Sequence, residues 1–526
     1  MALFSSTASI YAIVTFIGIS LWQLSQIGRR PKDYPPGPPT LPLLGNLHLI
    51  PDKKRHLQFE KWAREYGPIF SLMLGTKAMI VLSSDQAIKD LVDKRGAIYS
   101  SRPDAYIAQD ILSGGLRVLF MPNSPTGAWK MVRKFLHTLL SVNSARTYVP
   151  YQDLENKAML LSMLENPNSF IEHLRRYTAS LTTQMTFGFR TTSIEDPRFK
   201  QAFDTAAMLD LLPILRNLPD FLLPIKREGR KIHMNERNLF RSYFLSIKKA
   251  TLEGTAKAKE GFKDDLAAYI SGSVLQAGSE TTASILVGFV QAMVIWPEVA
   301  RAAQEELDRV CGDRLPDLND LPDLPYIRAC AKESLRWMPG FFLGIPHAVT
   351  KEDTYLGYRI PKGAIVILNV WGVHMDPERH PDPRKFDPMR YLGDDQSSMD
   401  AANNPDASKR DHFVFGAGRR RCQGMHIADR SMYLAISRLL WAFDFKRVID
   451  PSTQEEIVPD MENLADGMMS LPHPFPANIV PRSEHKAQRV RDEWREVSIL
   501  LDGEAQWKDV PKGLIWNDEK AQTDDF

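Results

Sequence analysis

The sequence predicts a mainly α-helical protein with small β-sheets, of the α+β class, preceded by one N-terminal transmembrane helix. Three observations lead to this prediction. Residues 124–303 carry apolar side chains mostly at helical spacing, and short strand-like runs lie on both sides of them. The first 27 of the 526 residues contain no Asp, Glu, Lys, Arg or His.

The uncharged start of the chain, residues 1–27, predicts a membrane anchor. Its apolar core, residues 8–24, can cover about 30 Å of hydrocarbon, and three basic residues follow: Arg29, Arg30 and Lys32. A secretory signal would have a basic start and a small-residue cleavage site, and neither is visible. A cleaved signal or a hydrophobic presequence is the alternative. By the positive-inside rule, the rest of the chain faces the cytoplasm.

A basic and proline-rich linker, residues 28–42, connects the anchor to the folded body, because proline fixes φ and removes backbone donors. We expect the body to span residues 43–482. Strands are predicted at 69–74 and 79–82, with Gly75 at the turn, and later at 355–360 and 364–370. Residues 85–94 have helical spacing, and helix breaks are expected at five prolines: Pro150, Pro167, Pro197, Pro213 and Pro219.

Residues 266–296 contain a single charge, Glu280, and are long enough to be read as a second membrane span. Three glycines and the polar run 278–282 argue against that reading, because a carboxylate at bilayer depth is costly. A long helix in the core of a large soluble domain is therefore predicted. The charged C-terminal tail, residues 483–526, has one amphipathic stretch, 484–501, for which we expect a surface helix or partial disorder.

Composition excludes several classes of function. The net charge of +2 is too small to indicate a nucleic-acid partner. Only three cysteines occur, Cys311, Cys330 and Cys422, which argues against a disulfide scaffold. No close pair of cysteines suggests a metal clip, and a zinc site at Cys422 is excluded because only His426 lies nearby.

The strongest chemical signal is the segment 415–424, a glycine-rich loop that delivers Cys422 to the start of a predicted helix, 425–441. A thiolate there gains the partial positive charge and free N–H groups of a helix N-terminus, and the arginines at 419–421 favour the anion further. Gly418 and Gly424 permit tight turns and the close approach of a flat partner, and Phe415 can shield the sulfur. Taken alone, the segment also fits a buried structural cysteine beside solvated arginines.

This loop resembles that of the cytochromes P450, the haem-thiolate monooxygenases. The family has Phe, Gly, Arg, Cys and Gly at five fixed places, held here by Phe415, Gly418, Arg420, Cys422 and Gly424. The resemblance extends from the proline-rich linker to about Pro481. It implies the triangular, helix-rich haem-thiolate monooxygenase fold, with haem b bound through Cys422 as the axial thiolate ligand of its iron.

Other segments match the family as well. Residues 277–281 fit the pattern of its distal helix, which implies that Glu280 and Thr281 are catalytic and relay protons, while Gly278 leaves room for O₂ beside the helix. On this helix alone, a kink with a satisfied hydroxyl is the alternative. Partners for the haem propionates are implied at four positions: Trp129, Arg133, His347 and Arg420. A structural network is implied at three: Glu333, Arg336 and Arg390.

The resemblance also implies partners. Electrons would come from an NADPH-dependent diflavin reductase, or cytochrome b5, in the same endoplasmic reticulum membrane, since no flavin or nicotinamide fingerprint is seen. We expect a basic docking face for it from Lys130, Arg133, Lys134 and the arginines at 419–421. Within the family, the sequence resembles most the members from filamentous fungi, many of which serve secondary-metabolite pathways.

The substrate is expected to be small and apolar or weakly polar, because the segments that would line the pocket carry no cluster of charge. These segments are 104–119, 203–223, 277–281, 339–345 and 466–469. Three alternatives stay open: a detoxifying or catabolic aromatic hydroxylase, a haem-thiolate isomerase or dehydratase that needs no electrons, and a non-enzymatic haem sensor. Residues 248–266 are short for the family, so either a surface helix is trimmed or the region is wrongly spliced.

Overall fold

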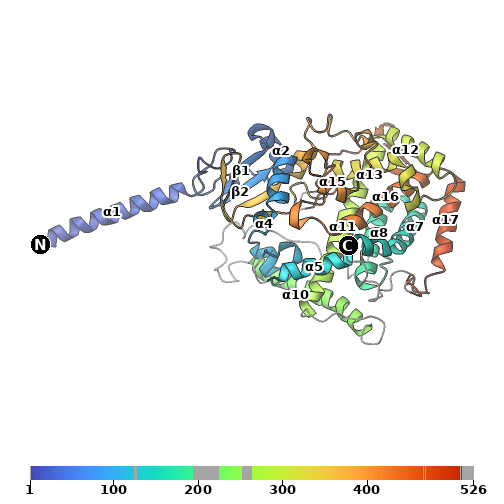
Figure 1. Ribbon diagram of the computed structural model, residues 1–526, viewed down its shortest axis with the longest axis horizontal. Coiled ribbons are helices and arrows are strands. Elements are labelled where there is room, and N and C mark those ends of the chain that lie inside the picture. The colour runs from blue at the N-terminus through green and yellow to red at the C-terminus, as the bar shows by residue number, and fades with distance from the viewer. Residues whose placement is uncertain are drawn as a thin grey trace.

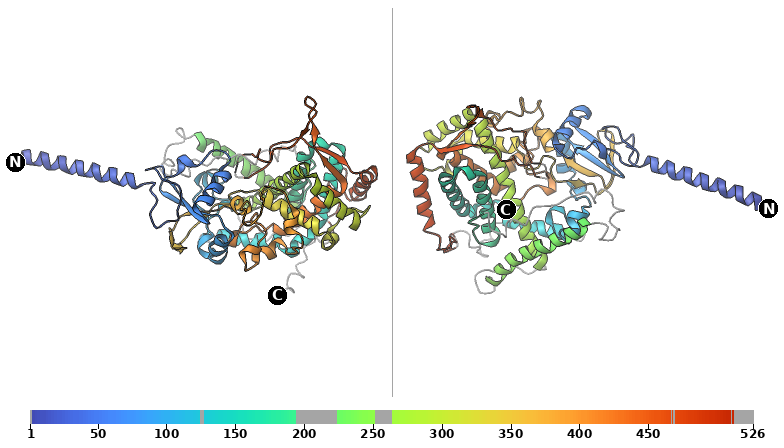
Figure 2. Two further views of the ribbon diagram at one scale, coloured as in Figure 1. Left: turned by 90° about the horizontal axis from the view of Figure 1, so that it is seen from above. Right: turned by 180° about the vertical axis from the view of Figure 1, so that it is seen from behind.

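The computed structural model describes residues 2–123, 127–193, 224–250, 264–465, 467, 469–509 and 511. Helices form most of the body, and the small sheets lie mainly at the end from which the first helix projects (Figure 1). The two further views show the same arrangement, with the last long helix at the edge opposite to the N-terminus (Figure 2). The α+β class predicted from the sequence is confirmed.

Eleven of the described helices have twelve residues or more: α1 (Ala2–Gln26), α2 (Arg55–Tyr66), α5 (Ala128–Leu140), α7 (Val149–Glu165), α8 (Phe170–Phe187), α10 (Pro224–Ala250), α11 (Asp264–Ile295), α12 (Pro297–Val310), α13 (Pro325–Trp337), α16 (Met425–Ala442) and α17 (Glu484–Ser498). The shorter α-helices are α3 (Asp85–Ile88), α4 (Gly96–Tyr99), α6 (Val142–Thr147), α14 (Val370–His374) and α15 (Ser398–Asn403). Two π-helical turns are η2 (Lys89–Lys94) and η3 (Tyr106–Ile111). The 3₁₀ turns are η1 (Leu47–Leu49), η4 (Val118–Phe120), η5 (Pro167–Ser169), η10 (Leu318–Asp323), η11 (Pro388–Tyr391), η12 (Ala407–Lys409) and η13 (Gly418–Arg420).

The largest sheet has the order β1-β2-β6-β3. Its strands are β1 (Ile69–Leu74), β2 (Lys77–Leu82), β6 (Ile365–Leu368) and β3 (His347–Ala348). The antiparallel β1–β2 pair is the predicted hairpin, and Gly75 at its turn has a φ of 59°. Three two-stranded sheets pair β4 (Asp353–Tyr355) with β5 (Tyr358–Ile360), β7 (Phe443–Lys446) with β10 (Asn478–Pro481), and β8 (Val448–Ile449) with β9 (Glu456–Ile457).

One strand prediction was wrong in detail. The run 355–360 was expected to be a single strand, but the chain reverses within it and forms the β4–β5 hairpin. Leu356 and Gly357 at its turn both have positive φ values, 50° and 80°. Two such residues in succession make the tight turn that suits antiparallel strands, and an apolar side chain at the first of them hid the turn from the sequence pattern.

The prediction that residues 266–296 form a long helix in the protein core is confirmed. Helix α11 is, within the described part of the chain, the helix that is long and apolar enough to cross a membrane, but 78% of its most apolar window is buried in the protein. It packs on α8, α10, α13 and α16 and lies at the centre of the main core. Every side chain from Ala283 to Val294 is buried.

Helix α1 extends away from the body (Figure 1). Its described apolar side chains are exposed. Tyr11 is 74% exposed, Phe16 71% and Trp22 64%. At 1.5 Å per residue, its 25 residues are long enough to span a hydrocarbon layer of about 30 Å. The membrane anchor remains a prediction, with these exposed side chains in its favour.

The surface helix that was one of two expectations for residues 484–501 is confirmed as α17. Helix α17 packs on α7, where Lys157 and Glu493 form an ion pair of 2.8 Å. Beyond it, the Trp507 indole N–H donates to Gln184 of α8 over 2.5 Å, and the Arg190 guanidinium donates to the carbonyl of Ala505 over 2.7 Å. These contacts bind α17 and the segment after it to α7 and α8.

Helix breaks appear at two of the predicted prolines. Pro150 lies in the first turn of α7, and Pro167 separates α7 from α8. The other three prolines, the pocket segment 203–223, residues 466 and 468, and most of the short segment 248–266 lie outside the described residues.

Candidate functional site

Cys422 lies at the end of a loop whose shape is set by backbone contacts. Its N–H donates to the carbonyl of Phe415 over 2.8 Å, and η13 turns the chain between the two residues. Gly418 has a φ of 60°, and an added Cβ would overlap the carbonyl of Val92 in η2. Gly418 also donates its N–H to Asp93 over 2.6 Å. The missing side chain at 418 thus allows η13 to pack against η2, which differs from the predicted approach of a flat partner.

The sulfur of Cys422 has an unusual environment. The side chain is exposed, yet burial by surrounding protein raises the pKa of its thiol above the ordinary value. The Gly424 N–H and the Arg133 guanidinium lower that pKa, but they do not outweigh burial. The predicted helix-terminus effect is therefore present but is not the largest one. The Cys422 thiol lies deep in the protein and still has exposed surface, so it must face an open space inside the molecule.

Helix α11 also has exposed surface on one face although most of the helix is buried, which indicates an open space there. Ala277 is the only exposed residue among the 32 of α11, all of which are described. Thr281 lies one turn further along the same face, and its hydroxyl donates to the Ala277 carbonyl over 2.6 Å. Helix α11 packs on α16, the helix that follows the Cys422 loop.

Three guanidinium groups gather at the edge of this region. Arg420 donates to the carbonyls of Ser100 (2.7 Å) and Met121 (2.6 Å), and Arg133 donates to the carbonyl of Arg421 over 2.8 Å. Arg102, which the sequence analysis did not single out, donates to the carbonyls of Leu119, Ile345 and Pro346. Within the described residues, none of the three arginines forms an ion pair with a carboxylate.

Burial and repulsion between neighbouring cations lower the pKa values of Arg420 and Arg102. Burial, together with Arg102 and Arg133, lowers the pKa of Arg420 to about 8. Burial and Arg133 lower the pKa of Arg102 to about 9. His347 is buried with Nδ1 donating to the Tyr99 carbonyl over 2.7 Å, and burial, Arg102 and Arg420 lower its pKa to about 3. A cluster of buried positive charge is costly without an anion.

Trp129 completes the cluster. Its indole ring lies under two of the cations, with the guanidinium carbon of Arg420 3.8 Å and that of Arg133 6.0 Å from the ring centroid. Such an arrangement holds guanidinium groups in place through the negative face of the ring. The structure thus brings together Trp129, Arg133, His347 and Arg420, the four residues predicted from separate segments, and adds Arg102.

These residues fit a haem. The group needs a soft axial ligand and cationic partners for two carboxylates. The chain offers an accessible thiol, one buried guanidinium group (Arg102) and two half-buried ones (Arg133 and Arg420), without an ion-paired carboxylate among the described residues. At Gly424 an added Cβ would come within 3.8 Å of the Cys422 sulfur, so the glycine keeps the approach to the sulfur open. Among the residues that the structure describes, no three or more His, Cys, Asp or Glu side chains gather in a group that could hold a metal ion.

Glu280 lies on α11 next to Thr281 but interacts with a different neighbour. Its carboxylate is 3.8 Å from the Arg175 guanidinium of α8. Burial raises the pKa of Glu280, and Arg175 opposes that effect. The carboxyl therefore holds its proton to a higher pH than an exposed glutamate does.

The expected role of Gly278 was wrong. A Cβ on Gly278 would lie 2.7 Å from the hydroxyl oxygen of Thr182 in α8, so the space beside this glycine is filled by protein and holds no room for O₂. The glycine lets α8 and α11 approach closely, and Thr178 reaches the Ser279 carbonyl across the same contact. Sequence reasoning could identify the small residue but not the side of the helix on which its neighbour lies.

Glu333 and Arg336 form a bidentate pair on α13, with both N–O distances at 2.6 Å and both side chains fully buried. Arg390 approaches the same Glu333 carboxylate to 3.5 Å. The Arg336 carbonyl lies 2.9 Å from Nδ1 of His374, whose Nε2 accepts the N–H of Phe413 at 2.8 Å. The network predicted from three separate segments is thus connected to the start of the Cys422 loop.

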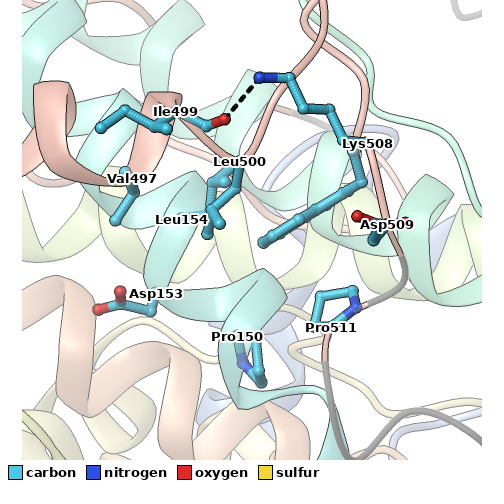
Figure 3. A pocket seen from close by; sticks show the side chains of 10 residues that line it. Pro150, Asp153, Leu154, Val497, Ile499, Leu500, Lys508, Asp509 and Pro511 are labelled. Carbon is cyan, nitrogen blue, oxygen red and sulfur yellow. Dashed lines mark hydrogen bonds between the residues drawn. The ribbon is translucent and has the colours of Figure 1, made fainter.

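The structure also has a cleft away from Cys422. A cleft of about 560 Å³ separates the start of α7 from the C-terminal tail, and none of the predicted site residues lines it (Figure 3). Leu154, Leu500 and Trp507 give it an apolar wall, and Lys508 donates to the Ile499 carbonyl over 2.9 Å. The chemistry described above therefore belongs to the region of Cys422 and not to this cleft.

Comparisons with known proteins agree with the geometry. The family model described as cytochrome P450 matches residues 35–474. The chain is 60% identical to the cytochrome P450 monooxygenase fogE of Aspergillus ruber, over 98% of this chain and 99% of that protein. It is 59% identical to the cytochrome P450 monooxygenase virE of Hypocrea virens, over 96% of each chain. For the cytochrome P450 monooxygenase fsoB of Humicola fuscoatra the identity is 45%, over 95% of this chain and 97% of that protein.

A solved structure of a zebrafish cytochrome P450 with abiraterone has the same fold. Its TM-score is 0.65 at 24% identity, and the match covers 81% of this chain and all of that one. Family and fold together imply a haem iron with a cysteine thiolate ligand. The chain belongs to the cytochrome P450 family of haem-dependent monooxygenases.

Proposed function

We propose that this monooxygenase oxidises a small, largely apolar molecule in a fungal secondary-metabolite pathway, with Cys422 as the thiolate ligand of the haem iron. The observation that carries the assignment is the cluster of Arg102, Arg133 and Arg420, three buried or half-buried cations without an anionic partner among the described residues, close to an accessible thiol. The fungal relatives named above support the biological role.

In this proposal, the three arginines, Trp129 and His347 hold the haem carboxylates, while Phe415, Gly418 and Gly424 shape the loop that presents the sulfur. A carboxylate beside His347 would offset the burial that keeps its imidazole neutral. When bound, the haem supplies oxygen activation, and a thiolate ligand favours cleavage of the O–O bond by donating electron density. Glu333, Arg336 and Arg390 keep the loop in place and take no part in the chemistry.

Glu280 and Thr281 are the proposed proton donors. The Thr281 hydroxyl is exposed on the open face of α11 and can pass a proton at Oγ1 while it accepts another. Glu280 holds a proton at its carboxyl because burial raises its pKa, and the partly exposed Arg175 beside it can release that proton by stabilising the carboxylate.

The proposed electron donor is an NADPH-dependent diflavin reductase, or cytochrome b5, of the endoplasmic reticulum membrane. Lys130 and Lys134 are exposed on α5, and Gln423 of the Cys422 loop donates to the Arg133 carbonyl of the same helix over 2.9 Å. A basic face therefore lies directly beside the loop. Reversing Lys130 and Lys134 to Glu should raise the reductase concentration needed for half-maximal turnover; an unchanged concentration would count against this face.

The exposed apolar side chains of α1 support a single-pass anchor with the body in the cytoplasm. Expression of residues 28–526 should move the protein from the membrane fraction to the soluble fraction. Recovery of the truncated chain in the membrane fraction would show that other surfaces anchor it.

The assignment of the haem ligand is tested by the absorbance of the reduced carbon monoxide complex. A thiolate ligand shifts the Soret band strongly to the red, and Cys422→Ser should abolish that shift while Cys311→Ser leaves it intact. A band without the shift in the unchanged protein would overturn the assignment. Product formation that depends on NADPH and reductase then distinguishes the monooxygenase from an isomerase or a sensor, and metabolite profiling after gene deletion identifies the pathway.

A further inference from the structure

Two charged side chains contact the backbone of the Cys422 loop at two of its glycines. Asp93 of η2 accepts the N–H of Gly418 over 2.6 Å. Arg410, which precedes the loop, donates through Nη2 to the carbonyl of Gly416. Both glycines have positive φ values, 60° at Gly418 and 67° at Gly416. A donor and an acceptor of the loop backbone, two residues apart, are therefore bound by side chains of opposite charge.

Asp93 and Arg410 also lie beside each other. Nη1 of Arg410 is 3.7 Å from Oδ2 of Asp93, which is within ionic contact but beyond an ordinary hydrogen bond. Both atoms are buried, and neither has a hydrogen-bond partner among the described residues. Lys89 of the same turn η2 lies 3.8 Å from that carboxylate oxygen. The attraction between the opposite charges holds the two side chains together, while Oδ1 of Asp93 and Nη2 of Arg410 bind the loop.

Arg410 is fixed by further contacts. Its Nε donates to the His412 carbonyl over 3.1 Å, and its guanidinium carbon lies 4.2 Å from the ring centroid of Phe413. Burial lowers the pKa of Arg410 to about 10, although Asp93 and Asp411 act in the opposite direction. A guanidinium charge buried in this way is costly unless a carboxylate lies near it, and Asp93 supplies one from η2.

Both glycines that the pair holds are connected to Cys422. The Cys422 N–H donates to the carbonyl of Phe415, the residue directly before Gly416, over 2.8 Å. The N–H of Arg421, the residue directly before Cys422, donates to the Gly418 carbonyl over 3.2 Å. A shift of either glycine would therefore be passed to the backbone of Cys422 through one hydrogen bond.

Asp93 and Arg410 act on the loop backbone rather than on the charge of the sulfur. Among the described groups, the charges that shift the pKa of the Cys422 thiol are those of Arg133 and Asp429. A bond from a side chain to a metal ion depends on the position of the ligand atom to about 0.5 Å. Residues that orient such a ligand commonly change metal affinity or activity by about ten- to a hundredfold when they are removed.

We propose that Asp93 and Arg410 are positioning residues that hold the Cys422 sulfur where it binds the haem iron as a thiolate. This inference rests on the proposed function, because it takes Cys422 as the axial ligand. It gives a role to a buried charge pair whose carboxylate lies on η2, far from the loop in the sequence.

The test is the absorbance of the reduced carbon monoxide complex of the full-length holoprotein. Protein that keeps the thiolate ligand has the red-shifted Soret band, and protein that has lost it has the unshifted band. The ratio of the two bands therefore reports the position of the sulfur in folded protein. Asp93→Ala removes the acceptor of the Gly418 N–H, and Arg410→Met removes the donor to Gly416. Each variant should lower the ratio about tenfold.

Asp93→Asn separates positioning from stability. Its amide oxygen can still accept the Gly418 N–H, but the negative charge that faces Arg410 is gone. The midpoint of denaturant unfolding should therefore fall, as it does in Asp93→Ala. The ratio of the two bands should nevertheless stay close to that of the unchanged protein, because the loop backbone keeps its contact.

Asp320→Ala is the matched control for Asp93→Ala. Asp320 also accepts a backbone N–H, that of Asp317 over 2.8 Å, and its carboxylate pairs with Arg314. This variant should lower stability and leave the ratio unchanged, because the backbone that Asp320 holds belongs to the start of η10.

Arg190→Met is the corresponding control for Arg410→Met. Arg190 donates to the Ala505 carbonyl over 2.7 Å and pairs with the buried Glu155, so it also joins a backbone carbonyl to a carboxylate. Its partners lie in the C-terminal tail and in α7, and the ratio should stay unchanged.

Each outcome decides the matter. An unchanged ratio in Asp93→Ala overturns the inference, and so does a fall in Asp93→Asn equal to that in Asp93→Ala. An equal fall in Asp320→Ala or Arg190→Met would show that the ratio follows general stability, which also overturns it. If Arg410→Met yields no folded holoprotein, the two Asp93 variants decide alone. Absence of the red-shifted band in the unchanged protein would overturn the assignment of Cys422 and this inference with it, whereas an intact band there with an unchanged ratio in Asp93→Ala overturns the inference alone.

Discussion

The guanidinium group of Arg420 lies over the indole ring of Trp129, with its central carbon 3.8 Å from the ring centroid. The two residues are almost three hundred positions apart in the chain, one in the Cys422 loop and one on α5. Their contact fixes the loop to the helix at the point where two more arginines converge. Several consequences of this arrangement and of the surrounding packing are measurable.

Trp129→Leu should weaken haem binding. A desolvated cation–π contact contributes about 2 kcal/mol, so loss of the ring should increase haem dissociation by about tenfold or more. The rate of haem transfer to an excess of apomyoglobin measures this. Trp22→Leu, on the exposed helix α1, is the control and should not change the rate. Equal rates for both variants would show that the ring does not support the cluster.

Glu333→Gln should strongly destabilise the fold. Both members of the Glu333–Arg336 pair are fully buried, and removing the carboxylate leaves the guanidinium charge without its partner, at a cost of about 3–5 kcal/mol. The midpoint of denaturant unfolding, followed by fluorescence, should fall accordingly. Arg64→Ala breaks the Arg64–Glu60 pair, whose arginine is 64% exposed, and should shift the midpoint by less than about 1 kcal/mol in equivalent free energy. A small effect of Glu333→Gln would mean that the Glu333–Arg336 pair does not hold η11 and the Cys422 loop in place.

Gly278→Ala should destabilise the contact between α8 and α11. The new methyl group would lie 2.7 Å from the Thr182 hydroxyl oxygen, and overpacking of this kind costs about 1–3 kcal/mol, more than the gain of about 1 kcal/mol in helix propensity. Thr182→Ala removes the obstructing atoms, so the double variant should recover stability. Thermal unfolding of the two single variants and the double variant gives the coupling energy. Additive effects would contradict the close approach of the two helices.

Stability should depend on pH through Asp429. Burial and the neighbouring Asp411 raise the pKa of this carboxyl to about 7, although Ser398 donates to it over 2.8 Å and Lys332 opposes the shift. The folded protein keeps the proton up to about pH 7, whereas the unfolded chain releases it near pH 4. The free energy of unfolding should therefore fall as the pH rises between these values. Asp429→Asn should flatten the profile in that window, and the exposed Asp52→Asn should not. A profile that keeps its slope in Asp429→Asn would assign the proton to another group.

Local patterns of the sequence predicted most of the elements that hold the site. The hairpin of β1 and β2, the helix after Cys422 and the buried nature of α11 follow from periodicity, glycine and proline, which act over a few residues. These patterns missed the turn at Leu356 and Gly357, because it lies within a run of residues typical of a single strand. In the C-terminal tail the amphipathic pattern predicted the helix α17 but not its contacts with α7 and α8.

The sequence predicted the reaction class through its resemblance to the cytochromes P450, because the five family residues around Cys422 lie within one segment of the chain, 415–424. It also predicted Trp129, Arg133, His347 and Arg420 through family resemblance, without showing that they meet. Only the tertiary structure decided that Arg102 joins them and that Gly278 faces Thr182. The physical reason is that charge pairing and close packing depend on distances between atoms, and residues far apart in the chain acquire those distances only when the helices pack.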